Sequence, residues 1–307
     1  MKRPNFFVAG APRCGTTALY TYLKRHPYIF LPSIKELHYF ASDFSDVQKI
    51  AFKTDNDYLK IFAGANERHL AVGEISPLYF YSKVALNRIK EFDPSAKIIL
   101  ALRNPVDFVQ SIHQLNLGLL REDEPDLAKA WGLQDLRRQG KMLPASCREP
   151  RLVLYGELGL FGKYVERALE VFDRKQVLFL LFDDLASNPK AVYETLLSFL
   201  GVPSDGRTDF PAVNAGFEQK SKMLAKIIHP PRPVYRVFMK AISIFGVNFM
   251  KNISLIYNKI EGLNLQRTPR DAMDPSLRAR LQSYFRDDIQ KLAILTERDL
   301  SAWLTAA

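Results

Sequence analysis

The feature that most constrains this chain is a short apolar run, followed by a glycine-containing loop and then by a helical pattern. The run Phe6 to Gly10 reads FFVAG, the loop that follows reads APRCG, and the helical pattern begins at Thr16. A buried strand followed by such a loop aims backbone N–H groups and the positive end of a helix at one point, which favours an anion site. The alternative is a tight turn that needs glycine and binds nothing. The flanking strand and helix favour the anion site.

Two further apolar runs, 97–102 (KIILAL) and 177–182 (VLFLLF), have the character of strands buried on both faces. Helical patterns separate these runs and are expected at 16–25, 82–92, 106–119, 162–172 and 189–200. Alternation of strands with helices predicts an α/β fold with a central parallel sheet and right-handed crossovers. The expected architecture is a three-layer αβα domain.

Two regions depart from this alternation. Residues 120–151 are charged and contain three prolines, so we interpret them as a mobile or lid-forming insertion. Residues 227–266 mix prolines, aromatic residues and basic residues; we interpret them as a helical appendage, with a membrane-surface or acceptor-binding segment as the alternative. Apolar spacing predicts a final helix from Pro275 to about Trp303. We expect one domain over 1–307 with a helical C-terminal extension at 227–307.

The charge and the cysteines limit the partners. A formal net charge of +10 favours anionic ligands such as nucleotides, acidic glycans or anionic lipid surfaces. Cys14 and Cys147 are the only cysteines, so neither a disulfide framework nor a bound metal is expected. No apolar stretch reaches the roughly 18 residues of a membrane span, and no signal-peptide pattern opens the sequence. We therefore expect a cytoplasmic protein with no nucleic-acid partner.

The loop lacks the lysine of nucleotide triphosphatases. Their loops follow GxxxxGK[ST], in which lysine reaches the terminal phosphates and the hydroxyl residue helps to hold Mg²⁺. Here Thr16 stands in the lysine position, and the cation is Arg13 inside the loop. A kinase needs its lysine and metal to neutralise a triphosphate, whereas a phosphosulfate carries less charge at the transferring group. The pattern favours phosphosulfate, with a P-loop small-molecule kinase as the alternative.

The segment GAPRCGTTALYTYLKRHPYIFLPSIKELHYF resembles the 5′-phosphosulfate motif of sulfotransferases that use 3′-phosphoadenosine 5′-phosphosulfate (PAPS), particularly bacterial members and heparan sulfate sulfotransferases. The resemblance spans Phe6 to about Lys226, and the terminal DDIQKLAILTERDLSAWL is similar to bacterial members. It implies PAPS as cofactor and adenosine 3′,5′-bisphosphate as product. In this family the position of Arg13 is usually lysine, and arginine keeps the charge but cannot lose a proton. The resemblance assigns the phosphosulfate to Arg13, Cys14, Gly15, Thr16 and Thr17.

A second family element, LRNPVDFVQS, follows the 97–102 strand. The resemblance implies that Arg103 and Ser111 hold the 3′-phosphate, and Arg103 stands at a strand's carboxyl end, where open α/β sheets bind ligands. The alternative is a helix-capping arginine and a surface serine. The later stretch VNAGFEQKSKMLAKII resembles the segment that closes over the nucleotide, which implies cofactor contacts from Asn214, Lys220 and Ser221. The alternative is that Lys220 and Lys222 are solvated charges on a helix.

The run KELHYF supplies two candidate bases. In the family the glutamate of a similar run is taken as the base, which implies Glu36. His38 would project to the same side of an extended segment, and a histidine titrates near neutral pH without assistance. Both candidates are kept, with Lys35 as a cation near the sulfate. The alternative is a surface ion pair between Lys35 and Glu36 together with a core histidine.

The segment GEISPLYFY resembles a family segment that implies acceptor contacts from Glu74, Ser76 and Tyr79; the alternative is a turn before a helix. His113 is interpreted as a core or surface histidine. The resemblance implies direct in-line transfer, without metal, to a hydroxyl or amine of a carbohydrate, glycolipid or other small-molecule acceptor. A catalytically inactive nucleotide-binding protein is a further alternative. The sequence predicts no oligomeric state.

Overall fold

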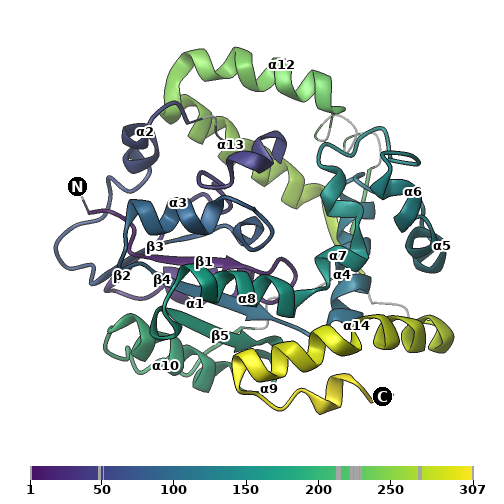
Figure 1. Ribbon diagram of the computed structural model, residues 1–307. Helices are drawn as coiled ribbons and strands as arrows, with labels where there is room; N and C mark the ends of the chain where they lie inside the picture. The colour runs from purple at the N-terminus through teal and green to yellow at the C-terminus, as the bar shows by residue number, and fades with distance from the viewer. Residues whose placement is uncertain are drawn as a thin grey trace. The chain divides into compact units, whose positions relative to one another are not determined.

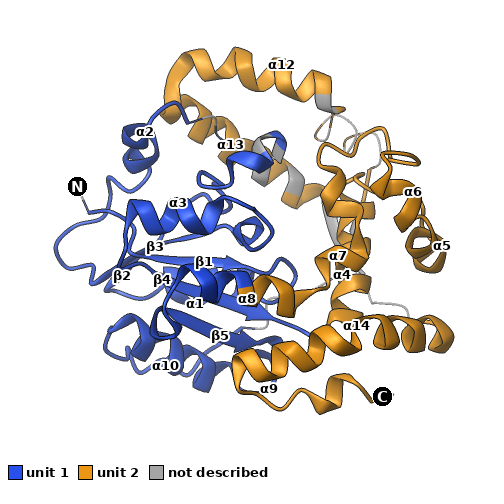
Figure 2. Ribbon diagram, in the orientation of Figure 1, with its two compact units in different colours: residues 1–103, 167–213 blue, residues 104–166, 214–307 orange. Residues whose placement is uncertain are grey.

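A computed structural model describes residues 2–47, 50, 52–211, 216–221, 224, 228, 230–268 and 272–305 of the chain (Figure 1). The chain divides into two units, which Figure 2 colours separately. Unit 1 comprises residues 1–103 and 167–213, and unit 2 comprises residues 104–166 and 214–307. The expectation of one domain over the whole chain stays a prediction.

Unit 1 is built on a five-stranded sheet in the order β2-β3-β1-β4-β5. All the pairings in this sheet are parallel, which confirms the predicted parallel α/β architecture. Two of the predicted strands, β1 and β4, have the predicted bounds. The strands are β1 (Phe6–Gly10), β2 (Ile29–Phe30), β3 (Ala71–Ile75), β4 (Lys97–Leu102) and β5 (Val177–Leu181).

The connections of the sheet reverse direction between β1 and β4. From β1 the chain passes through α1 (Thr16–Lys24) toward β2, whereas from β3 it passes through α3 (Ala85–Phe92) to β4 and later to β5. Right-handed crossovers place α1 and α3 on opposite faces, which gives the three layers expected from the sequence. The carboxyl ends of β1 and β4 form the switch point at which open α/β sheets bind ligands.

The remaining helices of unit 1 lie in the connections between the strands and after β5. The α10 helix begins and ends at the predicted residues, because Asn188 caps its start by accepting from the Ala191 N–H and Gly201 ends it with a φ of 74°. These elements are η1 (Ser42–Val47), α2 (Asp55–Lys60), η2 (Pro77–Phe80), η4 (Arg174–Gln176), α9 (Phe182–Ser187) and α10 (Pro189–Leu200).

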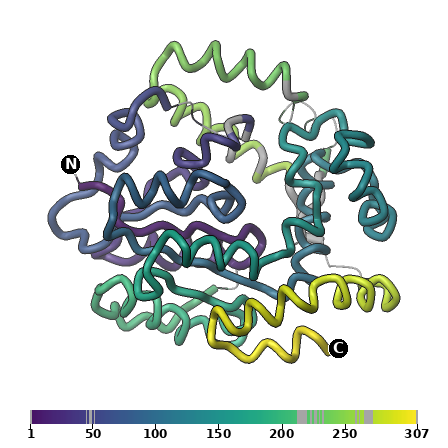
Figure 3. Tube along the Cα trace, in the orientation of Figure 1, coloured from purple at the N-terminus to yellow at the C-terminus, as the bar shows by residue number. Residues whose placement is uncertain are grey.

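Unit 2 is mainly helical, and α8 (Phe161–Val171) is divided between the units in the sequence. The trace in Figure 3 shows α12 turning back into α13, and both helices lie within the range 227–266 predicted as an appendage. The other elements are α4 (Pro105–Gly118), α5 (Leu127–Gly132), α6 (Gln134–Arg138), η3 (Pro150–Val153), α7 (Tyr155–Leu158), β6 (Gly216–Gln219), α12 (Arg232–Ile242), η5 (Ser243–Phe245), α13 (Gly246–Asn264), β7 (Leu265–Thr268), α14 (Pro275–Thr296) and η6 (Ser301–Trp303).

The final helix is shorter than predicted. It ends at Thr296, not near Trp303, because Glu297 adopts the left-handed conformation with a φ of 55°. The N–H of Glu297 then bonds back to carbonyl groups of the last helical turn, which satisfies them as a helix cap does. The expected continuation to Trp303 is wrong, and only a short 3-10 turn follows.

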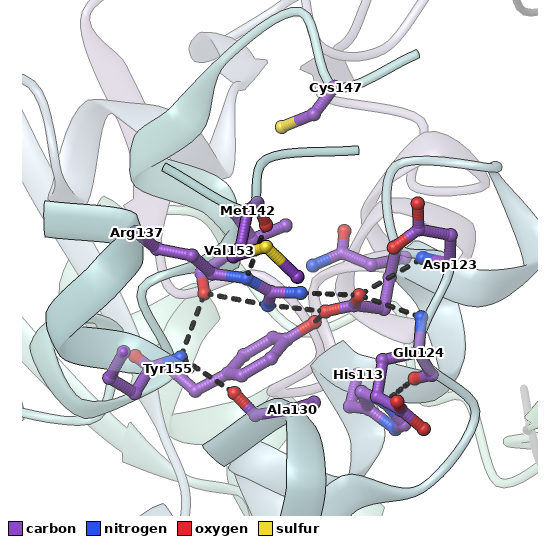
Figure 4. A network of polar contacts seen from close by, with 12 residues as sticks. His113, Asp123, Glu124, Ala130, Arg137, Met142, Cys147, Val153 and Tyr155 are labelled. Atoms are coloured by element: carbon purple, nitrogen blue, oxygen red, sulfur yellow. Dashed lines mark hydrogen bonds and ion pairs between the residues drawn. The ribbon is translucent and has the colours of Figure 1, made fainter. Parts of the chain in front are cut away.

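A buried ion pair anchors the insertion predicted at 120–151 (Figure 4). Arg137 of α6 donates through Nη1 and Nη2 to the two carboxylate oxygens of Glu122 at 2.6 and 2.7 Å, and both side chains are fully buried. The Tyr155 hydroxyl donates to Glu122 at 2.8 Å. Burial would raise the pKa of Glu122, but the hydrogen bonds from Arg137 and its other partners hold that pKa below its usual value. The insertion is thereby fixed to the start of α7.

Candidate functional site

The loop between β1 and α1 requires glycine at the start of the helix. Gly15 caps α1 with a φ of 93°, and a Cβ at this position would lie 2.5 Å from Leu185 Cδ2. Arg13 is also left-handed, with a φ of 63°. Among the described residues no side chain caps α1, so the N–H groups of its first turn are left for a ligand. This geometry supports an anion at the loop.

Arg103 lies directly beyond the carboxyl end of β4 and is 7% exposed. Its guanidinium carbon lies 4.4 Å from the centroid of the Phe182 ring. Within the described part of the chain, Arg103 Nε and Nη1 are buried and have no hydrogen-bond partner. Unsatisfied buried donors of a charged group are costly, and an anionic ligand would satisfy them. Binding of the 3′-phosphate by Arg103 stays a prediction, which these unpartnered donors favour.

Cys14 lies inside the loop and is fully buried. Burial raises the pKa of its thiol to about 12, although the nearby charges of Arg103 and Arg13 act in the opposite direction. A thiol with so high a pKa remains protonated at neutral pH and is a poor nucleophile. Cys14 can therefore serve the loop through packing and its backbone N–H.

The structure brings the KELHYF segment to the loop through Lys35. Lys35 Nζ donates to Thr17 Oγ1 at 2.9 Å and lies 3.9 Å from Glu36 Oε1. Thr17 is exposed, whereas Thr16 is buried in the first turn of α1. The ion pair between Lys35 and Glu36 thus exists at the edge of the loop. It places a cation and a carboxylate beside the same anion site.

The two candidate bases have different surroundings. Glu36 and His38 are left-handed, with φ values of 63° and 54°, so the argument from an extended segment does not apply to them. The Glu36 side chain is 37% exposed, whereas His38 is 3% exposed, and its ring meets Tyr79 edge-on with centroids 6.3 Å apart. Accessibility to an acceptor favours Glu36. Its role as base stays a prediction.

Glu74 holds the segment that carries these candidates. This fully buried carboxylate accepts hydrogen bonds from Ser76 Oγ at 2.5 Å, from the Tyr79 hydroxyl at 2.6 Å and from the Tyr58 hydroxyl. Burial raises the pKa of Glu74, against the effect of these hydrogen bonds. The Ser76 and Tyr79 hydroxyls in turn accept from the backbone N–H groups of His38 at 3.1 Å and Phe40 at 3.3 Å.

The three residues predicted to contact the acceptor are therefore all buried. Their hydrogen bonds connect β3 to the 35–40 segment, and the Glu36 N–H adds a bond to the Ile75 carbonyl at 2.9 Å. Acceptor contact by Glu74, Ser76 and Tyr79 stays a prediction. Tyr58, the third donor to the carboxylate, comes from α2 and was not found from the sequence, which offers no motif there.

The remaining predicted cofactor residues belong to unit 2. Ser111 is fully buried on α4. Lys220 Nζ donates to the Leu263 carbonyl at 3.0 Å, and the Ser221 N–H donates to Asn264 Oδ1 at 2.9 Å. These bonds tie both residues to the end of α13. Asn214 lies outside the described residues, and cofactor contact by the whole set stays a prediction.

His113 has the surroundings of a core histidine, as interpreted from the sequence. It is 3% exposed, one ring nitrogen lies 2.9 Å from the Glu124 carbonyl oxygen, and burial lowers the pKa of the imidazole. Among the described residues no group of three or more His, Cys, Asp and Glu side chains could hold a metal ion. No described helix is both long and apolar enough to cross a bilayer.

Sequence reasoning missed the residues that follow β5. Phe182 stacks on Arg103, and Leu185 packs against Gly15. The negative charge of Asp183 helps to raise the pKa of the Cys14 thiol. The available signal was their place after the third apolar run, because the carboxyl ends of parallel strands lie at one edge of a sheet. The geometry is compatible with one anion at the loop and another at Arg103, and the role of Glu36 as base stays a prediction.

Comparisons with known proteins identify the family of the chain. The family model described as the sulfotransferase domain matches residues 3–225. The chain is 30% identical over 211 residues to the bifunctional heparan sulfate N-deacetylase/N-sulfotransferase 4 of Mus musculus, covering 65% of this chain and 22% of that protein. It is 25% identical over 246 residues to carbohydrate sulfotransferase 15 of Homo sapiens, covering 65% and 44%. The chain thus spans less than half the length of these two relatives.

A solved structure covers nearly the whole chain. The crystal structure of a sulfotransferase from Alicyclobacillus acidocaldarius is similar with a TM-score of 0.70 and 28% sequence identity. The similarity covers 99% of this chain and 100% of that one. The likeness therefore extends over both units of the chain.

Proposed function

From the premise that the chain belongs to the sulfotransferase family and is an enzyme of sulfuryl transfer, we propose PAPS as its donor. The observation that carries this choice is Arg103. Its two unsatisfied buried N–H donors stand at the carboxyl end of β4, beside the strand that leads into the anion-binding loop. A donor with a phosphate at both the 5′ and the 3′ position supplies an anion to each place, whereas a nucleoside 5′-monophosphate supplies only one.

The loop residues support in-line transfer. Backbone N–H groups at Gly15 and the first turn of α1 would hold the phosphosulfate, and Arg13 would add a fixed positive charge. Lys35, which donates a hydrogen bond to Thr17, would stabilise charge that develops on the departing phosphate oxygen. The bond between sulfur and that oxygen breaks while the acceptor oxygen or nitrogen bonds to sulfur. Adenosine 3′,5′-bisphosphate is the leaving group.

Glu36 is the proposed proton acceptor. Its partly exposed carboxylate beside Lys35 can take the proton of the attacking hydroxyl or amine. His38 is the second candidate, since histidine is the side chain that most often acts as a general base. The buried network of Glu74 supports both by fixing the backbone of the segment that carries them.

We propose a glycan or another carbohydrate-containing molecule as the acceptor. Two of the similar proteins are named for heparan sulfate and carbohydrate, and the net charge of +10 favours acidic glycans. A glycolipid or another small-molecule alcohol or amine remains as the alternative. A panel of such acceptors with sulfur-labelled PAPS would identify the class.

Nucleotide binding tests the proposed donor. Titration calorimetry should show adenosine 3′,5′-bisphosphate binding at least about a hundredfold more tightly than AMP, because charge-assisted hydrogen bonds to the 3′-phosphate are present only with the former. Equal affinity for the two nucleotides would contradict PAPS as the donor. Turnover of ATP that depends on Mg²⁺ would instead support the kinase alternative.

A further inference from the structure

Exposed apolar side chains are concentrated in one part of unit 2. The α12 and α13 helices, joined by η5, form the hairpin that is green in Figure 3. Of the sixteen large hydrophobic residues exposed in the described part of the chain, ten lie between Val234 and Leu263. Single exposed apolar residues are ordinary on a protein surface, whereas a contiguous group marks an interaction surface.

The α12 helix has two apolar faces. Val234, Val237 and Phe238 recur at helical spacing and are 56%, 70% and 48% exposed. Tyr235 and Met239 lie on another side of the helix and are half-buried. One face therefore packs against the protein while the other presents an apolar stripe to solvent.

The α13 helix repeats this arrangement. Val247 and Met250 are buried on its inner face, whereas Phe249, Ile256 and Leu263 recur every seven residues and are exposed. At the tip of the hairpin, Ile244 and Phe245 are 76% and 67% exposed. The Phe245 and Phe249 ring centroids lie 4.9 Å apart, so the tip and the α13 stripe are continuous.

The charge of the hairpin is almost entirely basic. Residues 230–264 contain five Lys and Arg residues and a single acidic residue, Glu261. Arg236 and Lys240 are exposed one turn apart on α12, beside the apolar stripe, and Lys259 is exposed on α13. Apolar residues flanked by basic residues are the pattern of helices that lie in the interface of an anionic membrane.

We propose that the α12–η5–α13 hairpin binds anionic lipid membranes. The basic residues would contact lipid headgroups, while the tip and the exposed stripes enter the boundary between headgroups and acyl chains. Charge argues against a second copy of the chain as the occupant, because two such basic surfaces repel each other. An anionic bilayer gains attraction from each of the same residues. This surface lies apart in the sequence from the loop and does not depend on the donor.

Vesicle sedimentation tests the proposal with the full chain. The protein should sediment with vesicles that contain phosphatidylglycerol, should sediment less with pure phosphatidylcholine, and should be released by salt. Replacing Lys240 and Lys259 with glutamate should weaken binding by at least about thirtyfold, since each basic residue near the surface contributes roughly a fivefold factor. Failure of the unaltered protein to sediment with anionic vesicles at low salt would overturn the proposal.

The tip provides a second, independent variant. Replacing Ile244 and Phe245 with serine should reduce sedimentation, and replacing Ile294 with serine serves as the control because it is 78% exposed on α14. All these side chains are exposed, so the variants should keep the fold, as circular dichroism would show. If the tip variant bound vesicles as the control does, insertion would be contradicted. Self-association lost in the tip variant, without vesicle binding, would favour a second copy.

Discussion

Replacing Arg103 with methionine should weaken nucleotide binding without lowering the stability of the protein. Methionine keeps an unbranched side chain of similar length beside Phe182 but removes the charge and every N–H donor. In the free protein two of those donors are buried without a partner among the described residues. In the nucleotide complex the same donors would bond to the 3′-phosphate. The variant therefore separates a role in binding from a role in folding.

The structure allows both magnitudes to be estimated. Hydrogen bonds to a charged group contribute about 1.5–3 kcal/mol each, so loss of two should weaken binding by about 3–6 kcal/mol, or ~10²–10⁴-fold. Each unsatisfied buried donor costs about 1–3 kcal/mol, whereas the lost contact with Phe182 is a cation–π interaction of about 0.5–2 kcal/mol. The free energy of unfolding should accordingly stay the same or rise.

Calorimetry with adenosine 3′,5′-bisphosphate and AMP, together with urea unfolding, measures both effects. Arg174→Met is the matched control, because the Arg174 guanidinium also stacks on a ring, 4.8 Å from Phe179, but donates to the Val177 carbonyl at 3.0 Å. The control lies before β5, at the amino end of the sheet, and should keep the wild-type preference for the bisphosphate. If Arg103→Met kept that preference too, Arg103 would not bind the 3′-phosphate.

Three further changes test the proposed base, the buried carboxylate Glu74 and the buried ion pair. Glu36→Gln should lower the single-turnover rate of sulfuryl transfer by about 10²–10⁴-fold without weakening bisphosphate binding; a loss confined to His38→Gln would assign the proton to histidine. Because burial raises the pKa of Glu74, the folded state holds its proton more tightly than the unfolded state, so stability should fall as pH rises from the ordinary carboxyl pKa through the raised one. Glu74→Gln should flatten that fall in urea unfolding across pH, and an unchanged slope would refute the assignment. Arg137→Met should lower the free energy of unfolding by about 3–5 kcal/mol, because it leaves the Glu122 carboxylate buried without its partner. Adding Glu122→Gln should recover much of that free energy. Equal unfolding midpoints for the single and double variants would contradict this coupling.

Local sequence predicted the strands that form nearly continuous apolar runs. β1 is apolar along its length, β4 is apolar after Lys97, and both are bounded by turn residues, so their limits could be read directly. β3 was missed because Glu74 interrupts its apolar pattern. A carboxylate can occupy a buried strand here only because three hydroxyls, one of them from α2, converge on it. Such convergence depends on tertiary structure and leaves no periodic signal.

Some parts of the candidate site could likewise be predicted from the sequence, and others could not. The loop and Arg103 could be located from sequence because each directly follows a strand, and the end of a strand fixes where the next residues lie. The conformation of the 35–40 segment could not, since left-handed φ values at Glu36 and His38 are unfavourable for residues other than glycine and follow from no local preference. Hydrogen bonds from β3 and the turn after it impose them.

Unfavourable local features gather at the carboxyl edge of the sheet. Of the six described residues other than glycine with positive φ, Arg13, Glu36 and His38 belong to the loop and the segment beside it. The unsatisfied donors of Arg103 lie at the same edge. Each feature costs free energy in the protein without a ligand. Such a conformation persists only where the surrounding packing fixes it. The hydrogen bonds of Glu74 fix the 35–40 segment, and contact with Leu185 fixes the loop between β1 and α1. If this edge binds the proposed nucleotide donor, it would have little left to reorganise during transfer, which is how fixed donors and charges lower a barrier.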